Sequence, residues 1–440
     1  MEVSPLWMLA PLIILALLGC PIGFSLAGIG LCFGFFFWGP QFLSVIVTRF
    51  VGFQTNYILV AIPLFIFMGA LLERSGVGDK LYEAMHLMMG GVRGGLASAT
   101  IVISSLFAAC TGVVSASVTT VGFLTLPGML KRHYNKDLAC GTVMAGGCLG
   151  MLIPPSIMLV VIGAWSELSV GKLFLAAFLP GLLVSLIYII YISIRCGVNP
   201  NLGPPLPIEE RRASVGHKIH LLFVGLLPPL FLILAVLGTI IFGIATTTEA
   251  AGMGALGSII IVALNRRLSL STFLEACYRT VRLCGMIAVI ACGALTFASA
   301  FLGLGGGELV EEMLLGLGVG PLGVLAVMLL CLLVMGAFMD WFEILVITIP
   351  IFYPIAQMLG LDLIWFSILI AVVLQTSFLT PPYGLALFFL KGITPLIAPE
   401  ITMANLMRGI IPFTLLLILA LIILVFFPEI TLWLPAKLIA

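Results

Sequence analysis

The stretch Thr111-Gly112-Val113-Val114-Ser115-Ala116-Ser117-Val118-Thr119-Thr120 places hydroxyl groups and a glycine inside a long apolar segment. As helices, the apolar arms on either side, 96–111 and 117–130, would be about 24 Å and 21 Å long. Because the hydrocarbon core of a bilayer is about 30 Å thick, neither arm crosses it comfortably. The pattern therefore predicts a re-entrant hairpin over 94–130, with its tip near the middle of the membrane.

Composition identifies the whole chain as a membrane protein. Of its 440 residues, 62% are apolar and 8% are charged, whereas soluble domains carry about 25% charged residues. Apolar runs close to the roughly 20 residues of a helical span recur along the chain, which predicts an all-α polytopic fold. The formal net charge is +1, so the chain lacks the excess of basic residues that typically attracts a nucleic acid. The ten cysteines contain no C-x-x-C pair and are interpreted as packing residues.

Three further apolar segments are interrupted in a similar way. They are a helix over 139–164 broken at Pro154-Pro155, a second hairpin over 321–359 with its tip at Gly336–Asp340, and a helix over 363–390 broken at Thr380-Pro381-Pro382. A backbone break inside hydrocarbon leaves N–H and C=O groups without helical partners, each at a cost of several kcal/mol. Simple proline kinks are the structural alternative, but four breaks in matching positions favour a functional site.

The landmarks of the first half return in the second half at an offset of about 227 residues, which indicates an internal repeat. Gly112 corresponds to Gly336, and Pro154 corresponds to Pro381. The predicted organisation is a first repeat at 1–198 with an interfacial arm at 40–52, a hydrophilic cytoplasmic linker at 199–219, and a second repeat at 220–440 with an interfacial arm at 265–282.

The distribution of basic residues predicts the orientation. With the linker in the cytoplasm, every Lys and Arg except Arg49, Lys172 and Lys437 faces the cytoplasm, as the positive-inside rule requires. Both termini then lie in the periplasm and the two hairpins open to opposite faces. The repeats are therefore predicted to be inverted, an arrangement typical of secondary transporters.

The predicted breaks bring backbone carbonyl and hydroxyl oxygen atoms together. Proline donates no hydrogen bond, so the carbonyls before Pro154-Pro155 and Pro381-Pro382 are freed. Freed carbonyls joined by hydroxyls suit a hard monovalent cation, and half-helix N-termini favour an anion. This combination predicts a sodium-coupled site for an anionic solute. No G-x-S-x-G, H-E-x-x-H or P-loop motif supports an enzyme.

Two carboxylates, Asp340 and Glu249, have two interpretations each. Asp340 either lines the site or caps the following half-helix, with Glu343 then turned to water. Glu249 either couples an ion or caps a helix at Thr246-Thr-Thr-Glu249, and capping is favoured.

At these motifs the chain resembles the large membrane subunit of the tripartite ATP-independent periplasmic (TRAP) transporters, the DctM-like permeases. The most specific pieces are Gly150-Met-Leu-Ile-Pro-Pro-Ser156, Gly336-Ala-Phe-Met-Asp-Trp341, Thr248-Glu-Ala-Ala251 and Leu379-Thr-Pro-Pro-Tyr-Gly384. The resemblance covers essentially the whole chain. It implies an elevator-type transporter in the bacterial inner membrane that imports an organic acid, such as a dicarboxylate, with sodium. The implied partners are a small four-helix membrane subunit, a periplasmic binding protein and the surrounding lipids.

The resemblance also implies site residues. One Na⁺ site would use Ser115, Ser117, Gly150, Ile153 and Pro155, and a second would use Gly336, Met339, Thr376, Thr380, Pro382 and Gly384. The substrate would lie between the hairpin tips, near Thr111, Ser115, Thr119, Asp340, Thr376 and Thr380. Better-known dicarboxylate and sialate members have a Ser-Gly-Ser-Ser-like first tip, where this chain has Thr111-Gly-Val-Val-Ser115. The less polar rim favours a smaller or more apolar acid.

Two other functions are compatible with parts of this pattern. A stand-alone ion-coupled transporter of similar fold would need no binding protein, and the neighbouring genes would distinguish it. An ion channel would need a continuous polar stripe along a helix, which the sequence lacks.

Overall fold

A computed structural model describes residues 4–207, 214–381 and 384–438, and in these ranges the chain forms helices and no strands. Seven helical segments are long and apolar enough to cross a membrane. They are Tyr57–Arg74, Val170–Val198, Phe223–Ile241, Thr247–Leu264, Leu270–Gly303, Trp341–Met358 and Met403–Phe426. The prediction of an all-α polytopic fold is therefore confirmed.

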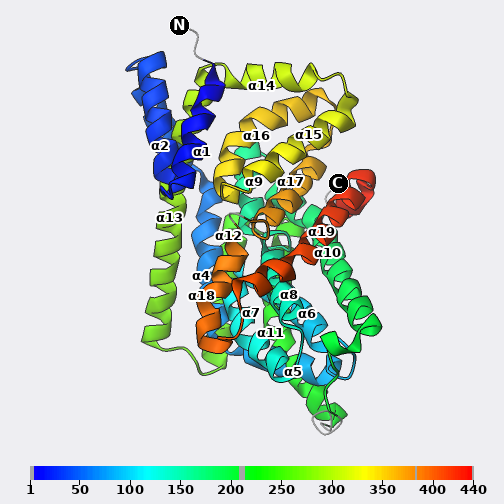
Figure 1. Cartoon of the computed structure of the whole chain (residues 1–440). Coiled ribbons are helices and arrows are strands. Elements are labelled where there is room, and N and C mark those ends of the chain that lie inside the picture. Colours follow the sequence, from blue (N-terminus) through cyan, green and yellow to red (C-terminus); the bar gives the residue numbers. More distant parts are fainter. Residues whose placement is uncertain (1–3, 208–213, 382–383, 439–440) are drawn as a thin grey trace.

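The helices pack as two groups, and each group takes helices from both halves of the sequence. The first, which we call the frame, consists of α1 (Leu9–Leu17), α2 (Ile22–Phe33), α3 (Phe42–Thr55), α4 (Ala61–Arg74), α5 (Val77–Met89), α11 (Val215–Ile241), α12 (Thr247–Leu264), α13 (Leu270–Gly303) and α14 (Gly306–Leu315). Within the frame, α2 packs along α13, α4 along α12, and α11 along α5. In Figure 1, the N-terminus and α14 lie at the end opposite α5.

The second group, which we call the bundle, contains all four predicted breaks. It consists of α6 (Gly95–Thr111), α7 (Val114–Lys131), α8 (Lys136–Cys148), α9 (Ile157–Ser166), α10 (Val170–Val198), α15 (Gly320–Met335), α16 (Trp341–Met358), α17 (Leu363–Ser377), α18 (Leu385–Ile397), α19 (Met403–Phe426) and α20 (Glu429–Leu438). In the bundle, α8 packs against α6, α7 and α19, and α16 packs against α9 and α17. The frame meets the bundle where α13 contacts α16 and α4 contacts α6.

Each predicted hairpin is a pair of helices separated by a short break. The first is α6–α7, which turns at Gly112 with a φ of 59°, a value that favours glycine. The second is α15–α16, which turns over 336–340. The two broken helices are α8–α9, interrupted around the cis Pro154–Pro155 bond, and α17–α18, interrupted after Ser377. The four predicted breaks coincide with helix ends.

The structure differs from the predicted organisation around 265–282. From Leu270 onward, this segment and the following apolar span form one 34-residue helix, α13, instead of an arm followed by a separate span. Two of the charged residues in this segment pair with α4. Arg279 Nη1 lies 2.5 Å from Glu73 Oε2, and Glu275 pairs with Arg74. The other predicted arm, 40–52, is helix α3, and α11 begins at Val215 inside the predicted linker. The division into two inverted repeats stays a prediction.

Close backbone contact between α2 and α13 gives a test of the frame. A Cβ on Gly30 would lie 2.7 Å from backbone atoms of Thr296 and Phe297, whereas a Cβ on Gly28, in the same helix, would meet nothing within 4 Å. We expect Gly30→Ala to destabilise the detergent-solubilised protein by about 1–3 kcal/mol, because the α13 backbone cannot move aside. Gly28→Ala should leave the melting temperature unchanged. Equal melting temperatures for the two variants would contradict this packing.

Candidate functional site

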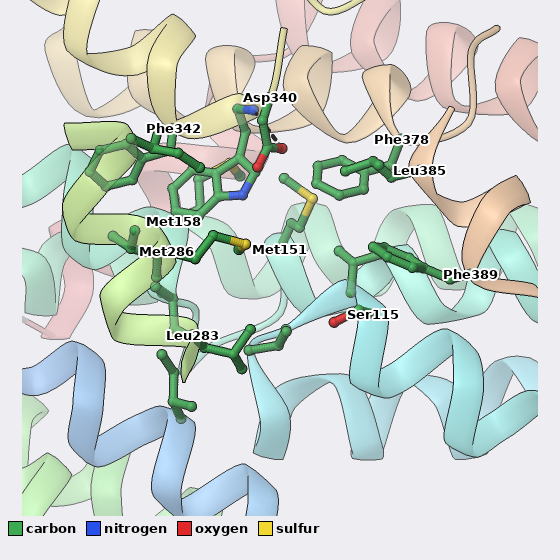
Figure 2. A pocket seen from close by; sticks show the side chains of 18 residues that line it. Ser115, Met151, Met158, Leu283, Met286, Asp340, Phe342, Phe378, Leu385 and Phe389 are labelled. Atoms are coloured by element: carbon green, nitrogen blue, oxygen red, sulfur yellow. Dashed lines mark hydrogen bonds between the residues drawn. The ribbon is translucent and has the colours of Figure 1, made fainter. Parts of the chain in front are cut away.

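Both hairpin tips and both broken helices border one cavity of about 110 Å³ (Figure 2). The first tip contributes 112–115, the second contributes 340–342, and α13 closes one side with apolar side chains that include Met286. Ser115 and Asp340 carry the hydroxyl and the carboxylate of this lining, and no Lys, Arg or His contributes to it. The cavity is therefore largely apolar, with its polar groups at the two tips.

A hydroxyl pair joins the two arms of the first tip. Thr111 Oγ1 and Ser117 Oγ are 2.7 Å apart, and both side chains are buried. Ser115 lies at the cavity, while Thr119 donates its hydroxyl hydrogen bond to the Ser115 carbonyl at 2.7 Å. The first tip thus presents Ser115 to the cavity and keeps Thr111 and Ser117 behind it.

The first broken helix leaves carbonyl oxygens free at the break. Ser156 Oγ donates to the Met151 carbonyl at 2.5 Å, and the backbone N–H groups of Leu152 and Ile153 both donate to the Leu149 carbonyl. No residue in the described ranges donates a hydrogen bond to the carbonyls of Ile153 or Pro155. These two carbonyls, with Gly150 close by in a single 3₁₀ turn, are among the predicted sodium ligands.

The second tip begins α16 with a capping carboxylate. Asp340 Oδ1 accepts a hydrogen bond from the Trp341 backbone N–H at 2.9 Å, and Asp340 also lines the cavity. Asp340 therefore caps α16 and also borders the cavity, and its role in binding stays a prediction. Glu343 does not face water, because it is 2% exposed and its Oε2 atom has no partner among the described residues. Glu249 caps α12 through a reciprocal pair with Thr246, as predicted.

The second broken helix carries polar groups that the sequence analysis missed. Gln375 and Ser377 are buried, and both amide atoms of Gln375 and the Ser377 hydroxyl have no hydrogen-bond partner in the described part of the chain. Ser377 lies against the second tip, because a Cβ on Gly336 would overlap its hydroxyl. The sequence feature that could have revealed these residues is the run of three polar residues at 375–377 in an otherwise apolar helix. Such orphaned groups at a helix break are typical of an ion or ligand site.

The remaining predicted residues lie around the same break. Thr376 Oγ1 donates to the Val373 carbonyl at 2.6 Å, and Thr380 Oγ1 donates to the Thr376 carbonyl at 2.8 Å. Gly384 caps the start of α18 in a left-handed conformation, with a φ of 31°. The Met339 carbonyl accepts no hydrogen bond from the described residues. Pro382 lies outside the described residues.

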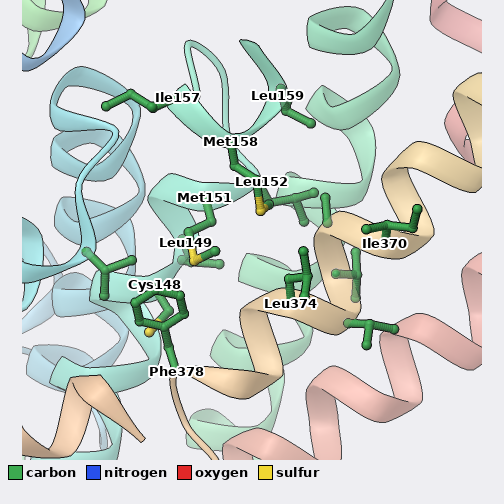
Figure 3. Close-up of a cluster of buried hydrophobic side chains, with 14 of the residues drawn as sticks. Cys148, Leu149, Met151, Leu152, Ile157, Met158, Leu159, Ile370, Leu374 and Phe378 are labelled. Carbon is green, nitrogen blue, oxygen red and sulfur yellow. The ribbon is translucent and has the colours of Figure 1, made fainter. Parts of the chain in front are cut away.

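An apolar cluster lies beside the first break and links it to α17. Figure 3 shows Cys148, Leu149 and Leu152 of the first broken helix gathered with Leu374 of α17 and Phe378. These side chains are at most 5% exposed. The two broken helices therefore approach each other through packed apolar side chains, which holds the two breaks in the same region of the bundle.

Comparison with known proteins identifies the family. The model for the tripartite ATP-independent periplasmic transporter, DctM component, matches residues 9–430. The chain belongs to this family. It is therefore a component of a transport system and not an enzyme, and it is a multi-pass protein of the inner membrane.

Several relatives of the family have named substrates. The chain is 33% identical to the C4-dicarboxylate TRAP transporter large permease protein DctM of Vibrio cholerae, over 96% of this chain and 95% of the relative. It is 28% identical to the sialic acid permease SiaM of the same species, over 95% of each chain, and 29% identical to the ectoine/5-hydroxyectoine permease UehC of Ruegeria pomeroyi, over 96% of each.

A solved structure supports the fold of this TRAP permease. The YdaH transporter of Alcanivorax borkumensis superposes with a TM-score of 0.64 at 14% identity, covering 97% of this chain and 99% of the other. At this identity the similarity extends to the fold alone.

The capping role of Asp340 can be tested separately from transport. Replacing Asp340 by Ala removes the acceptor for the Trp341 N–H, and we expect a loss of about 1 kcal/mol in stability. Asp340→Asn should keep the stability of the natural protein, because asparagine caps equally well. Thermal unfolding in detergent measures both variants. If Asn destabilises as much as Ala, the carboxylate stabilises the tip through its charge and not as a cap.

Proposed function

We propose that this permease imports an organic acid with sodium, using substrate that a periplasmic binding protein delivers. The proposed complex also contains a small four-helix membrane subunit, and both termini of the permease lie in the periplasm. The convergence of two hairpin tips and two broken helices, with oxygen atoms left unpaired at both breaks, carries this proposal.

Sodium fits the groups at the breaks. The carbonyls of Ile153 and Pro155 at one break, and the Ser377 hydroxyl with the Gln375 amide oxygen at the other, are uncharged oxygen ligands. The described part of the chain contains no group of three or more His, Cys, Asp or Glu residues that could hold a metal ion. A transition metal would therefore lack its usual ligands. Carbonyls of unwound helices coordinate Na⁺ in other secondary transporters.

The cavity between the tips favours a small acid with an apolar body. Its volume is about 110 Å³, and Val113, Val114 and aromatic side chains form much of its wall. An anion in this cavity meets the carboxylate of Asp340 and no basic side chain. A bound cation would offset the charge repulsion, so the apolar, acidic lining itself supports coupling to sodium.

The division into frame and bundle supports an elevator mechanism. Both tips and both breaks belong to the bundle, so a movement of the bundle along α13 and α4 would carry the whole site. The frame contributes mainly apolar side chains to the cavity, such as Ile66 and Ile287, which can slide without breaking hydrogen bonds. In this proposal the frame stays fixed in the bilayer.

Uptake by the reconstituted complex tests the proposal. The permease, the small subunit and the binding protein from the neighbouring genes are placed in proteoliposomes and offered radiolabelled mono- and dicarboxylates. We expect uptake of at least one acid under an inward sodium gradient, and none when potassium replaces sodium. Equal uptake without the gradient would contradict sodium coupling. Uptake without the binding protein would favour a stand-alone transporter.

Two hydroxyl substitutions test the location of the sodium sites. We expect the combined variant Ser117→Ala and Thr380→Ala to raise the half-saturating sodium concentration about fivefold, because each site loses a polar group worth about 1 kcal/mol. Thr100→Val is the matched control, since the Thr100 hydroxyl bonds only to the Leu96 carbonyl within α6. Unchanged sodium dependence of uptake in the combined variant would move the sites elsewhere.

A further inference from the structure

A second cavity, of about 410 Å³, lies between frame and bundle near the C-terminal end of α13. Its wall includes Trp38, Arg49 of α3, Trp165 at the end of α9, and residues of α13 and α16. The end of α13 leads directly into α14, which Figure 1 places at the end of the molecule opposite α5. By the distribution of basic residues, this end faces the periplasm.

Arg49 lies on the face of α3 that is turned toward the rest of the protein. Phe42 is buried in the frame, Val45 and Arg49 line the cavity, and Phe53 contacts Trp165 with ring centroids 5.5 Å apart. At helical spacing these four positions share one face, which is the face turned toward the protein.

The opposite face of α3 is apolar and exposed. Leu43, Val47 and Val51 are 46%, 62% and 54% exposed, which is typical of a face turned to lipid. A helix lying in the interface normally turns its apolar face inward or into lipid and its basic side chains to water. Arg49, the one basic residue of α3, is exposed in this way and also lines the cavity between frame and bundle.

The guanidinium of Arg49 has no ion-pair partner within the described residues, and no Asp or Glu lines the cavity. Because Arg49 is exposed while it lines the cavity, a solute can reach its guanidinium. Arg presents a planar fork of donors that matches a carboxylate, and tryptophan walls suit an apolar ligand body.

The wall of this cavity continues to the central one. Trp165 contacts Phe342 edge-on, with centroids 5.7 Å apart, and Phe342 lines the cavity between the tips. The two aromatic rings therefore separate an outer cavity that carries a positive charge from an inner cavity that carries none.

We propose that the Arg49 cavity is an entry site that binds the carboxylate of the incoming acid before the acid reaches the cavity between the tips. This inference rests on the proposed import of an organic acid. Arg49 holds the carboxylate, Trp38 and Trp165 contact the apolar body, and displacement of the Trp165–Phe342 contact opens the way inward.

Binding of a brominated carboxylate tests the entry site without knowledge of the natural substrate. The whole complex in phosphatidylcholine nanodiscs is titrated with 4-bromobenzoate, and quenching of tryptophan fluorescence is recorded. We expect saturable quenching that weakens about tenfold or more in Arg49→Gln, because a charge-assisted hydrogen bond is lost. Arg49→Lys should weaken it less. The uncharged 4-bromobenzamide should show no dependence on Arg49.

Controls separate this site from general charge effects and from lipid binding. Lys172→Gln removes another positive charge of the predicted outer face, outside the cavity, and should leave quenching unchanged. Equal affinity of 4-bromobenzoate for the natural protein and Arg49→Gln would overturn the proposal. So would complete loss of quenching in phosphatidylglycerol nanodiscs, because Arg49 would then be a lipid headgroup contact. Failure of sodium-driven uptake with Arg49-dependent quenching intact would refute the proposed coupling and leave the entry site standing.

Discussion

Every backbone polar group that leaves a helix inside the membrane needs another partner, and the architecture of this permease follows from that constraint. The chain breaks four times within its apolar segments, and all four breaks belong to the bundle. At the break in the first broken helix, the carbonyls of Ile153 and Pro155 accept no hydrogen bond from the described residues. Unpaired carbonyls of this kind are the ligands of the sodium sites that we propose.

The same constraint explains how cation and substrate could depend on each other. The cavity between the tips has apolar walls and a carboxylate at Asp340, so by itself it does not attract an anion. The unpaired oxygens at the breaks lie in the same tips and broken helices that border this cavity. In our account, sodium supplies the positive charge that the side chains lack, and Arg49 of the frame attracts the acid at an outer site between frame and bundle.

The local features of the fold could be predicted from the sequence, because their causes are local. Proline pairs and glycine fix the breaks at Pro154-Pro155 and Gly112 wherever the segment is placed, and the structure has its helix ends there. The continuous helix α13 could not be predicted in this way. Two charged residues near its start, Glu275 and Arg279, pair with Arg74 and Glu73 of α4, which are about 200 residues away in the sequence. The burial of Glu343 and the position of Arg49 at the wall of a cavity likewise depend on neighbours from distant elements.

The central claim is that both broken regions bind sodium. Hydrogen–deuterium exchange of the solubilised permease, compared in sodium and in potassium at equal ionic strength, tests it most directly. The account predicts that sodium slows exchange at 111–120 and 150–157 and also at 336–341 and 376–381, because a bound ion holds the unwound backbone in place. Equal exchange in the two salts at both regions would contradict it.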